Sequence, residues 1–351
     1  MPSIVGLGTA VPANVVHQDE AREYAAQHFQ RFLPHMDRLA TVFKHAAIDT
    51  RYFVVPREWW ANTDHSLQEC NDMYLREATN LAQQAIERAL ESAAVSAQDI
   101  NNLIFVSSSG IATPSLDALL INRLGMCSDV RRTPIWGLGC AGGVVGLARA
   151  ADTARAYPES LTVMVAVETC SLIFKFDDQS KTNFIGTSLF ADGAAAVVVA
   201  GDKRATKGVE ILDSQSTLYP NSQRVMGLDV VDSGFSLVLG VEIPAYVADS
   251  FRPFVDRFLS KHGLQVRQIE HFIFHPGGSK VIDAFDEALD LTNGHLNPSR
   301  EVLRNYGNMS SPTVLFVLDY IMRNSVIHPG DYGLAAAMGP GFSAEQLLVR
   351  F

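Results

Sequence analysis

The stretch that most constrains the fold is residues 134–151, PIWGLGCAGGVVGLARAA. Its apolar start predicts the end of a buried strand, and the Ala/Val/Leu-rich run after the glycines predicts a helix. Cys140 would then lie at or just before a helix N-terminus, where free backbone N–H groups and the helix dipole stabilise a thiolate. The alternative is a buried structural cysteine in a glycine-rich turn, and this stretch alone leaves both interpretations open.

The composition is typical of a globular protein, because 47% of the 351 residues are hydrophobic and 19% are charged. The net charge of −10 argues against a nucleic-acid partner. The cysteines form no CxxC pair, so the sequence predicts neither a metal site nor a disulfide framework, and a cytoplasmic location is expected. The N-terminus lacks the basic lead-in of a signal peptide, and no apolar run reaches the ~18 residues that a membrane span needs.

Strand-like and helix-like segments alternate along the chain. Apolar runs at 103–110, 161–171 and 188–201 predict buried strands, and periodic segments at 67–97 and 116–125 predict helices. This alternation predicts an α/β protein with a parallel-rich sheet covered on both faces. The polar tract GDKRATKG (201–208) is the best internal boundary, and it divides the chain into an N-terminal half, 1–204, and a C-terminal half, 205–351.

Two further candidates for chemistry lie in the C-terminal half. FIFHPGG places His275 at the end of a predicted strand, and NYGNMSS places Asn308 in a turn that opens a helix. Taken singly, His275 is more often a core or loop histidine and Asn308 a turn residue. Together with Cys140 they form a set in which an imidazole activates a thiol and an amide hydrogen-bonds a carbonyl oxygen.

The motifs WGLGCAGG, FIFHPGG, YGNMSSPTVLFVL and AMGPGF, in this order, resemble those of the thiolase superfamily. Within it they resemble the type III polyketide synthases, the chalcone and stilbene synthase family. The resemblance implies a five-layered α/β/α/β/α fold built from two similar halves. It also implies that Cys140, His275 and Asn308 are catalytic and that Phe190 and Phe235 gate a substrate pocket containing Ser310.

The resemblance further implies an activity and its partners. Cys140 would take a starter group from an acyl-CoA, and His275 would act as its countercation. His275 and Asn308 would then hold malonyl-CoA while it loses CO₂, with no metal or redox cofactor, in a homodimer. Three cations, Arg38, Lys44 and Arg51, could meet the CoA phosphates, although a solvated helix face is the more common role of such residues.

Four positions of the expected pocket indicate the starter. Thr113 stands where plant members often carry a methionine, and Ser108, Cys170 and Ile173 fall near the polar threonines of the plant pocket. Cys170 and Ile173 resemble the residues of bacterial members that make alkylpyrones or alkylresorcinols, so we expect a medium- or long-chain fatty acyl starter. The alternatives are a single condensation like that of ketoacyl-carrier-protein synthase III, a cysteine hydrolase, or a non-catalytic acyl-binding protein.

Overall fold

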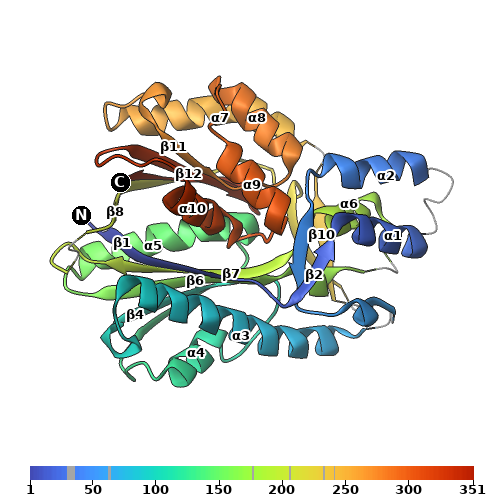
Figure 1. The fold of residues 1–351 in the computed structure, drawn as a ribbon, viewed down its shortest axis with the longest axis horizontal. Helices are drawn as coiled ribbons and strands as arrows, with labels where there is room; N and C mark the ends of the chain where they lie inside the picture. Colours follow the sequence, from blue (N-terminus) through green and yellow to red (C-terminus); the bar gives the residue numbers. More distant parts are fainter. Residues whose placement is uncertain (30–35, 62–64, 176–177, 205–206, 232–233, 241) are drawn as a thin grey trace.

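The computed structural model describes residues 1–29, 36–61, 65–175, 178–204, 207–231, 234–240 and 242–351, with backbone only at 36–40 and 61. Nine strands form one sheet, in the order β11-β12-β13-β8-β1-β7-β6-β4-β5 (Figure 1). In chain order they are β1 (Ser3–Ala10), β4 (Asn102–Val106), β5 (Arg131–Ile135), β6 (Leu161–Thr169), β7 (Asp192–Ala200), β8 (Val209–Leu218), β11 (His271–Phe274), β12 (Tyr332–Gly339) and β13 (Ser343–Arg350).

The sheet repeats one pattern of pairing in each half of the chain. From β1 the neighbours are β7, β6 and β4, and from β8 they are β13, β12 and β11. In both series the first two pairs are antiparallel and the third is parallel. The two series meet where Ser3 and Ile4 of β1 pair with Glu210 and Val209 of β8. The fold therefore consists of two similar halves joined edge to edge.

The predicted parallel-rich sheet is wrong. Only β4–β5, β4–β6 and β11–β12 pair in parallel among the described strands, and the other neighbours are antiparallel. The long apolar runs of β6 and β7 suggested parallel strands because every position in both is buried. These strands are buried instead because helices cover both faces of the sheet. In the middle of a layered protein, an antiparallel pair is covered in this way just as a parallel pair is.

The helices form three layers around the two halves of the sheet (Figure 1). On one outer side α3 (Leu67–Ala93) packs on β1, β6 and β7, and α4 (Leu116–Leu124) packs on β4 and β5. On the other, α7 (Ile243–Ser260) and α8 (Ser279–Leu289) share a core with β11 and β12. In the middle, α5 (Gly142–Ala156) and α10 (Thr313–Asn324) contact each other and strands of both halves. The predicted five-layered arrangement is confirmed.

Close approach in the middle layer depends on glycine. A Cβ atom at Gly143 of α5 would lie 2.2 Å from the carbonyl oxygen of Ser311, which precedes α10. A Cβ at Gly146 would lie 2.3 Å from Met164 of β6. The glycines of the 134–151 stretch therefore let α5 pack against both the sheet and the GNMSS loop, and this contact brings the segment after Asn308 to the start of α5.

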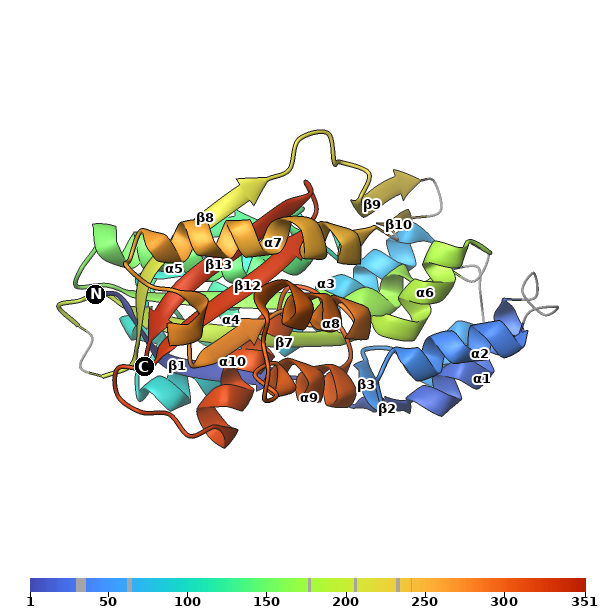
Figure 2. The same ribbon diagram turned by 90° about the horizontal axis from the view of Figure 1, so that it is seen from above.

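The remaining elements gather at one end of the molecule, on the right in Figures 1 and 2. They are β2 (Asn14–His17), α1 (Gln18–His28), α2 (Met36–His45), β3 (Thr50–Phe53), α6 (Lys181–Leu189), β9 (Met226–Val231) and β10 (Gly234–Leu239), with α9 (Asn297–Tyr306) beside β3. The sequence does not predict α6 or β9, because neither shows a clear apolar period. No helix in the described ranges is long and apolar enough to cross a membrane.

Candidate active site

Cys140 lies in a single 3₁₀ turn, Gly139–Ala141, that leads directly into α5. The residue before it, Gly139, has a φ of +45°, and a Cβ there would lie 2.9 Å from Pro340. This turn holds the cysteine, whose exposure is 6%, at the N-terminal end of a buried helix, where the sequence places it. Backbone geometry therefore presents the thiol at the electropositive end of α5.

The thiol and the imidazole are both buried. Burial raises the pKa of Cys140 to about 11, although hydrogen bonds from the side chains of Ser310 and Asn308 act in the opposite direction. His275, at the end of β11, is 4% exposed, and burial lowers the pKa of its imidazole to about 3. Burial thus opposes the charged forms of both groups, the thiolate of Cys140 and the imidazolium of His275.

His275 is held through its backbone, and its ring nitrogens form no hydrogen bond with the described residues. The backbone N–H of His275 donates to Ala336 O at 2.8 Å. Neither ring nitrogen has a hydrogen-bond partner among the described residues, although both are buried. Buried polar atoms normally have hydrogen-bond partners. The two unpaired ring nitrogens are therefore available to bind a substrate or the thiol.

Asn308 is fixed through both its backbone and its side chain. Its N–H donates to Leu189 O and its carbonyl accepts from the N–H of Ala191, each at 2.9 Å, so that Asn308 and Phe190 form a parallel β-bridge. Its side-chain Oδ1 accepts from the N–H of Ser310 at 2.8 Å, and Nδ2 donates to Gly277 O at 3.2 Å. The Asn308 side chain also forms a hydrogen bond with the Cys140 thiol, so its amide lies beside the nucleophile.

Two cavities meet at Cys140. The first, here the Ser108 cavity, has a volume of about 280 Å³ and is lined by Ser108, Cys170, Ile173, Leu228, Leu237 and Ser310, among others. The second, here the His275 cavity, has a volume of about 460 Å³ and is lined by His275, Asn308, Ile185, Lys181 and Lys280, among others. Cys140, Phe190, Met226 and Leu239 line both cavities. The thiol therefore faces the point where one space opens into the other.

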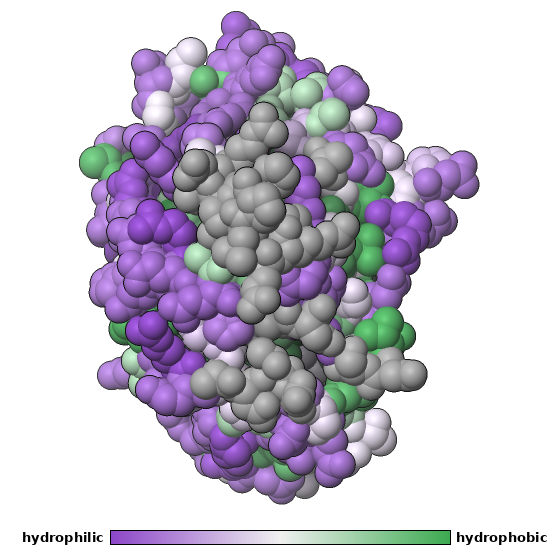
Figure 3. Space-filling model, turned by 90° about the vertical axis from the view of Figure 1, so that its right-hand side faces the viewer, coloured by the Kyte–Doolittle hydropathy of each residue, from purple (hydrophilic) through white to green (hydrophobic). Residues whose placement is uncertain are grey.

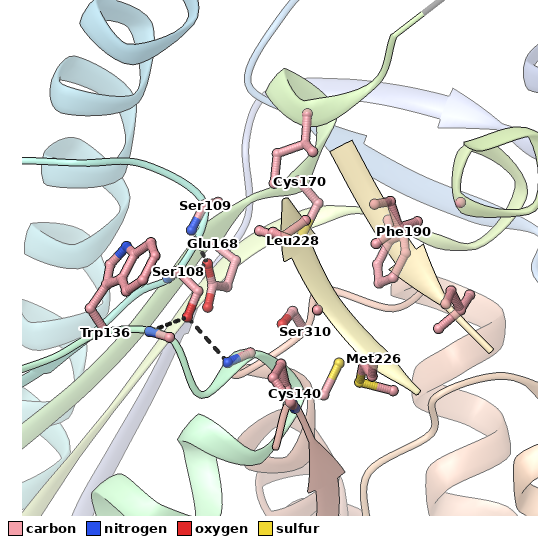
Figure 4. A pocket seen from close by; sticks show the side chains of 18 of the residues that line it. Ser108, Ser109, Trp136, Cys140, Glu168, Cys170, Phe190, Met226, Leu228 and Ser310 are labelled. Carbon is pink, nitrogen blue, oxygen red and sulfur yellow. Dashed lines mark hydrogen bonds between the residues drawn. The ribbon is translucent and has the colours of Figure 1, made fainter. Parts of the chain in front are cut away.

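A buried carboxyl group that the sequence does not single out forms part of the Ser108 cavity. Glu168 lies one residue before the end of β6, is 1% exposed, and accepts hydrogen bonds from the backbone N–H groups of Ser108 and Ser109 at 3.0 Å (Figure 4). Burial raises the pKa of Glu168 to about 7, against these hydrogen bonds. The signal in the sequence is one acidic residue in the otherwise apolar run LTVMVAVET.

Ser108 braces the loop that carries the nucleophile. Its Oγ accepts hydrogen bonds from the backbone N–H groups of Gly137 at 3.2 Å and Gly139 at 3.1 Å (Figure 4). The side chain is buried and still lines the cavity. Ser108 thus links the end of β4 to the turn at Cys140.

The structure brings most of the predicted pocket residues together but not all of them. Ser108, Cys170, Ile173, Ser310 and Phe190 line the Ser108 cavity.

Two others lie apart from it. Phe235 is buried in β10 outside the cavity walls that the described residues form, and Leu237 and Leu239 of the same strand line the cavity instead. Thr113 is exposed on the loop after β4 and borders neither space within the described part of the chain.

The prediction that Arg51 binds CoA is wrong. Arg51 is 0% exposed, and its Nη1 donates to the carbonyl oxygens of Thr187 at 2.7 Å and Phe190 at 2.8 Å. The guanidinium therefore faces the protein interior and cannot reach a phosphate in solvent.

The other two predicted cations lie in α2. Lys44 is exposed in the last turn of this helix, and the side chain of Arg38 is outside the described residues. The basic side chains that do line the His275 cavity are His45, Lys181 and Lys280. In the described ranges no three His, Cys, Asp or Glu side chains are grouped to hold a metal ion.

Comparison with known proteins decides the family. The family model "Chalcone and stilbene synthases, N-terminal domain" matches residues 2–203, and that of the C-terminal domain matches residues 210–351. The chain belongs to the chalcone and stilbene synthase family. The predicted family is confirmed, and with it the chain is a type III polyketide synthase, an acyltransferase of the condensing kind.

Relatives of this type III polyketide synthase match over nearly the whole chain. A "putative chalcone synthase" of Bacillus subtilis is 41% identical over 99% of this chain and 98% of its own length. The 1,3,6,8-tetrahydroxynaphthalene synthase of Streptomyces peucetius is 36% identical over 99% and 93%. The 3,5-dihydroxyphenylacetyl-CoA synthase of Amycolatopsis balhimycina is 33% identical over 99% and 92%.

Solved structures of type III polyketide synthases share the fold. The crystal structure of 1,3,6,8-tetrahydroxynaphthalene synthase from Streptomyces coelicolor superposes with a TM-score of 0.95 at 32% identity, covering 99% of both chains. A polyketide synthase of the brown alga Ectocarpus siliculosus gives a TM-score of 0.92 at 30% identity, covering 99% of this chain and 98% of its own. The predicted thiolase-like fold is thereby confirmed.

Proposed function

We propose that this type III polyketide synthase loads a medium- or long-chain fatty acyl group onto Cys140, extends it repeatedly with malonyl-CoA, and releases pyrone or resorcinol products. The observation that carries this proposal is the position of Cys140 between two unlike cavities. One is walled largely by apolar side chains and suits a growing acyl chain. The other holds His275 and Asn308 beside exposed cations and suits a CoA thioester.

Loading begins with attack of the Cys140 sulfur on the carbonyl carbon of the acyl-CoA thioester. The thiol proton passes to His275, whose neutral imidazole can accept it, and then to the departing CoA sulfur. The carbon–sulfur bond to CoA breaks as the bond to Cys140 forms. A neutral imidazole is the form that burial favours, so His275 is proposed as a base rather than as a standing countercation.

Extension follows when malonyl-CoA enters the His275 cavity. Cleavage of the bond to its carboxylate releases CO₂ and leaves an electron pair as an enolate on the thioester oxygen. An N–H of His275 and one of Asn308 Nδ2 stabilise that oxygen, and each such donor contributes about 3 kcal/mol in comparable sites. The enolate carbon attacks the acyl group on Cys140, the new carbon–carbon bond forms, and the cysteine sulfur leaves. Only CoA thioesters are consumed.

The rim of the His275 cavity supplies the expected binding partners for CoA. Lys181 of α6, Lys280 of α8 and His45 of α2 are exposed there. The end of the molecule that carries α2 and α6 is mostly hydrophilic over its described surface (Figure 3). We infer that the CoA phosphates bind Lys181 and Lys280, in place of Arg51, with Lys44 and Arg38 as candidates further along α2.

The apolar wall of the Ser108 cavity favours an alkyl starter. Ile173, Leu228 and Leu237 line it, and each CH₂ group moved from water into such a wall contributes about 0.8 kcal/mol. The competing function is synthesis from malonyl-CoA alone. It is suggested by relatives named for tetrahydroxynaphthalene and dihydroxyphenylacetyl-CoA, which contain no long alkyl chain.

We also infer a homodimer, formed on the side of β5. This strand is an edge of the sheet with exposed residues along it, and the neighbouring Ile111 and Trp136 are 46% and 57% exposed. Trp136 also lines the Ser108 cavity, so a second copy on this face would lie beside that space and beside Thr113. Light scattering of Trp136→Glu and of the wild type compares their oligomeric states and tests this interface. If the variant remains a dimer, the interface lies elsewhere.

One experiment tests the starter and the reaction type together. Purified enzyme receives malonyl-CoA with acyl-CoA starters from C6 to C18, with coumaroyl-CoA, or with no starter, and products are identified by mass. Best kcat/KM with fatty acyl-CoAs, giving triketide and tetraketide pyrones, is the expected result. Product from malonyl-CoA alone at a higher rate supports the competing function. A requirement for malonyl-carrier protein, or free acid without CO₂, would overturn the polyketide assignment.

A further inference from the structure

The buried guanidinium of Arg51 caps the C-terminus of a helix. The last carbonyl groups of a helix have no partner within it, and a basic side chain there satisfies them. In α6 the carbonyl of Thr187, in its last turn, and that of Phe190, just after it, both accept from Arg51 Nη1. Arg51 comes from β3, so this cap joins two elements that are 136 residues apart in the chain.

The capped segment is also the backbone partner of Asn308. Leu189 O accepts from the N–H of Asn308, and the N–H of Ala191 donates to the carbonyl of Asn308, each at 2.9 Å. Phe190 lies between these two contacts, lines both cavities, and is the residue that Arg51 holds. A path of three hydrogen bonds therefore runs from the guanidinium through residues 189–191 to Asn308.

The carboxylate of Asp192, on the same segment, fixes a turn that forms another part of the Ser108 cavity wall. Asp192, two residues beyond Phe190, accepts from the N–H groups of Val54 and Ser171, each at 2.7 Å. Ser171 belongs to the turn Cys170–Ile173, which forms part of the Ser108 cavity. The charges of Arg51 and Asp192 stabilise each other.

A contribution to folding stability does not by itself explain why an arginine is buried at this position. Arg51 is fully buried, its guanidinium lies 5.1 Å from the centroid of the Phe53 ring, and its Nε and Nη2 atoms have no hydrogen-bond partner among the described residues. An incompletely paired charge in the interior is costly, and whole buried ion pairs are often replaced by apolar side chains of similar volume without loss of stability. Beyond stability, Arg51 provides a fixed position for the segment that is hydrogen-bonded to Asn308.

We propose that Arg51 is a positioning residue for malonyl-CoA decarboxylation: by capping α6 it holds Phe190 and both backbone contacts of Asn308, and so keeps the Asn308 amide directed at the thioester oxygen. The inference rests on the proposed role of Asn308. It assigns to Arg51 a function inside the protein in place of the CoA contact that the sequence suggested.

The test compares two half-reactions in Arg51→Met and Arg51→Lys. The first is acylation of Cys140 by a fatty acyl-CoA, followed by protein mass, and the second is CO₂ release from malonyl-CoA. We expect Arg51→Met to lower kcat for decarboxylation about tenfold or more, with KM and the acylation rate changed less than about threefold. Arg51→Lys should recover part of the loss, because an ammonium group can still donate to one carbonyl.

Two further variants separate positioning from general destabilisation. Arg350→Met breaks an ion pair with Glu210 (Nε to Oε2, 2.7 Å) between β13 and β8, away from both cavities, and should leave both half-reactions unchanged at a temperature where the protein is folded. In the Asn308→Ala background, Arg51→Met should lower decarboxylation by less than about twofold, because the two residues act through one interaction.

The outcomes are distinguishable. Equal losses of acylation and decarboxylation in Arg51→Met, or full additivity with Asn308→Ala, would overturn the inference while leaving the proposed function in place. If Arg51→Met does not fold, Arg51→Lys alone decides, since a decarboxylation rate equal to that of the wild type would exclude a need for the two-carbonyl cap. Unchanged decarboxylation in Asn308→Ala would overturn both the inference and the proposed role of Asn308.

Discussion

Ser311 Oγ donates a hydrogen bond of 2.7 Å to Oε1 of Glu168 and joins the two halves of the protein at the active site. Glu168 lies near the end of β6 in the N-terminal half, and Ser311 belongs to the GNMSS loop that carries Asn308. The same loop packs against Gly143, just beyond Cys140. One hydrogen bond and one close backbone contact thus fix the position of Cys140 relative to Asn308 of the other half.

Glu168 should make the stability of the protein depend on pH. Its pKa in the folded protein is about 7, above the ordinary value of 4.5, so the folded state holds a proton that the unfolded state loses first. The contribution of Glu168 is therefore fully present below about pH 4.5 and is lost as the pH rises towards 7. We expect Glu168→Gln to reduce the fall in Tm between pH 5 and pH 8.

The measurement is thermal unfolding of both proteins across that range. Asp192, whose pKa is also raised by burial to about 7, acts in the same direction and should leave a residual slope in Glu168→Gln. An identical pH dependence in the variant and the wild type would show that Glu168 is ionised throughout.

Cys140→Ala should abolish acyl loading but retain decarboxylation of malonyl-CoA. The reason is that His275 and Asn308, which would stabilise the enolate, are both still present. Mass spectrometry of the protein after incubation with acyl-CoA measures loading, and acetyl-CoA formation measures decarboxylation. Polyketide product from this variant would contradict the assignment of the nucleophile, and Cys127→Ala, at an exposed cysteine, is the control.

His275→Ala and Asn308→Ala should each lower malonyl-CoA decarboxylation by about 10²–10³, the usual effect of losing one oxyanion donor. Only His275 can also accept the thiol proton, so its loss should slow the reaction of Cys140 with iodoacetamide more than the loss of Asn308 does. Equal slowing in the two variants would show that this division of roles is wrong.

Gly143→Ala should disrupt the middle layer. Its Cβ would lie 2.2 Å from the carbonyl oxygen of Ser311, and backbone on both sides of that contact cannot move without shifting α5 or the GNMSS loop. We expect a loss of at least ~2 kcal/mol in the free energy of unfolding, the scale of overpacking in a tight core. Gly227→Ala is the matched control, since nothing lies within 4 Å of a Cβ at that position. Similar stability of the two variants would contradict the expectation.

Much of the site could be predicted because its signals are local. Cys140 follows a glycine turn and opens an apolar helix, and His275 ends an apolar strand, so each position follows from a few neighbouring residues. The role of Asn308 is harder to predict from its neighbours alone, since an asparagine in a turn before a helix is common. Its contacts with Leu189 and Ala191 depend on α6, for which the sequence gives no clear period.

The sequence by itself determined the family, the order of most strands and helices, and the positions of Cys140, His275 and Asn308 at element ends. These depend on periodicity, glycine turns and motifs that are read over short stretches. Only the tertiary structure decided the direction of strand pairing and the side of β3 on which Arg51 lies. Arg51 faces inward because the carbonyl groups it satisfies come from α6, far along the chain, and no local pattern encodes a partner that folding alone brings into contact.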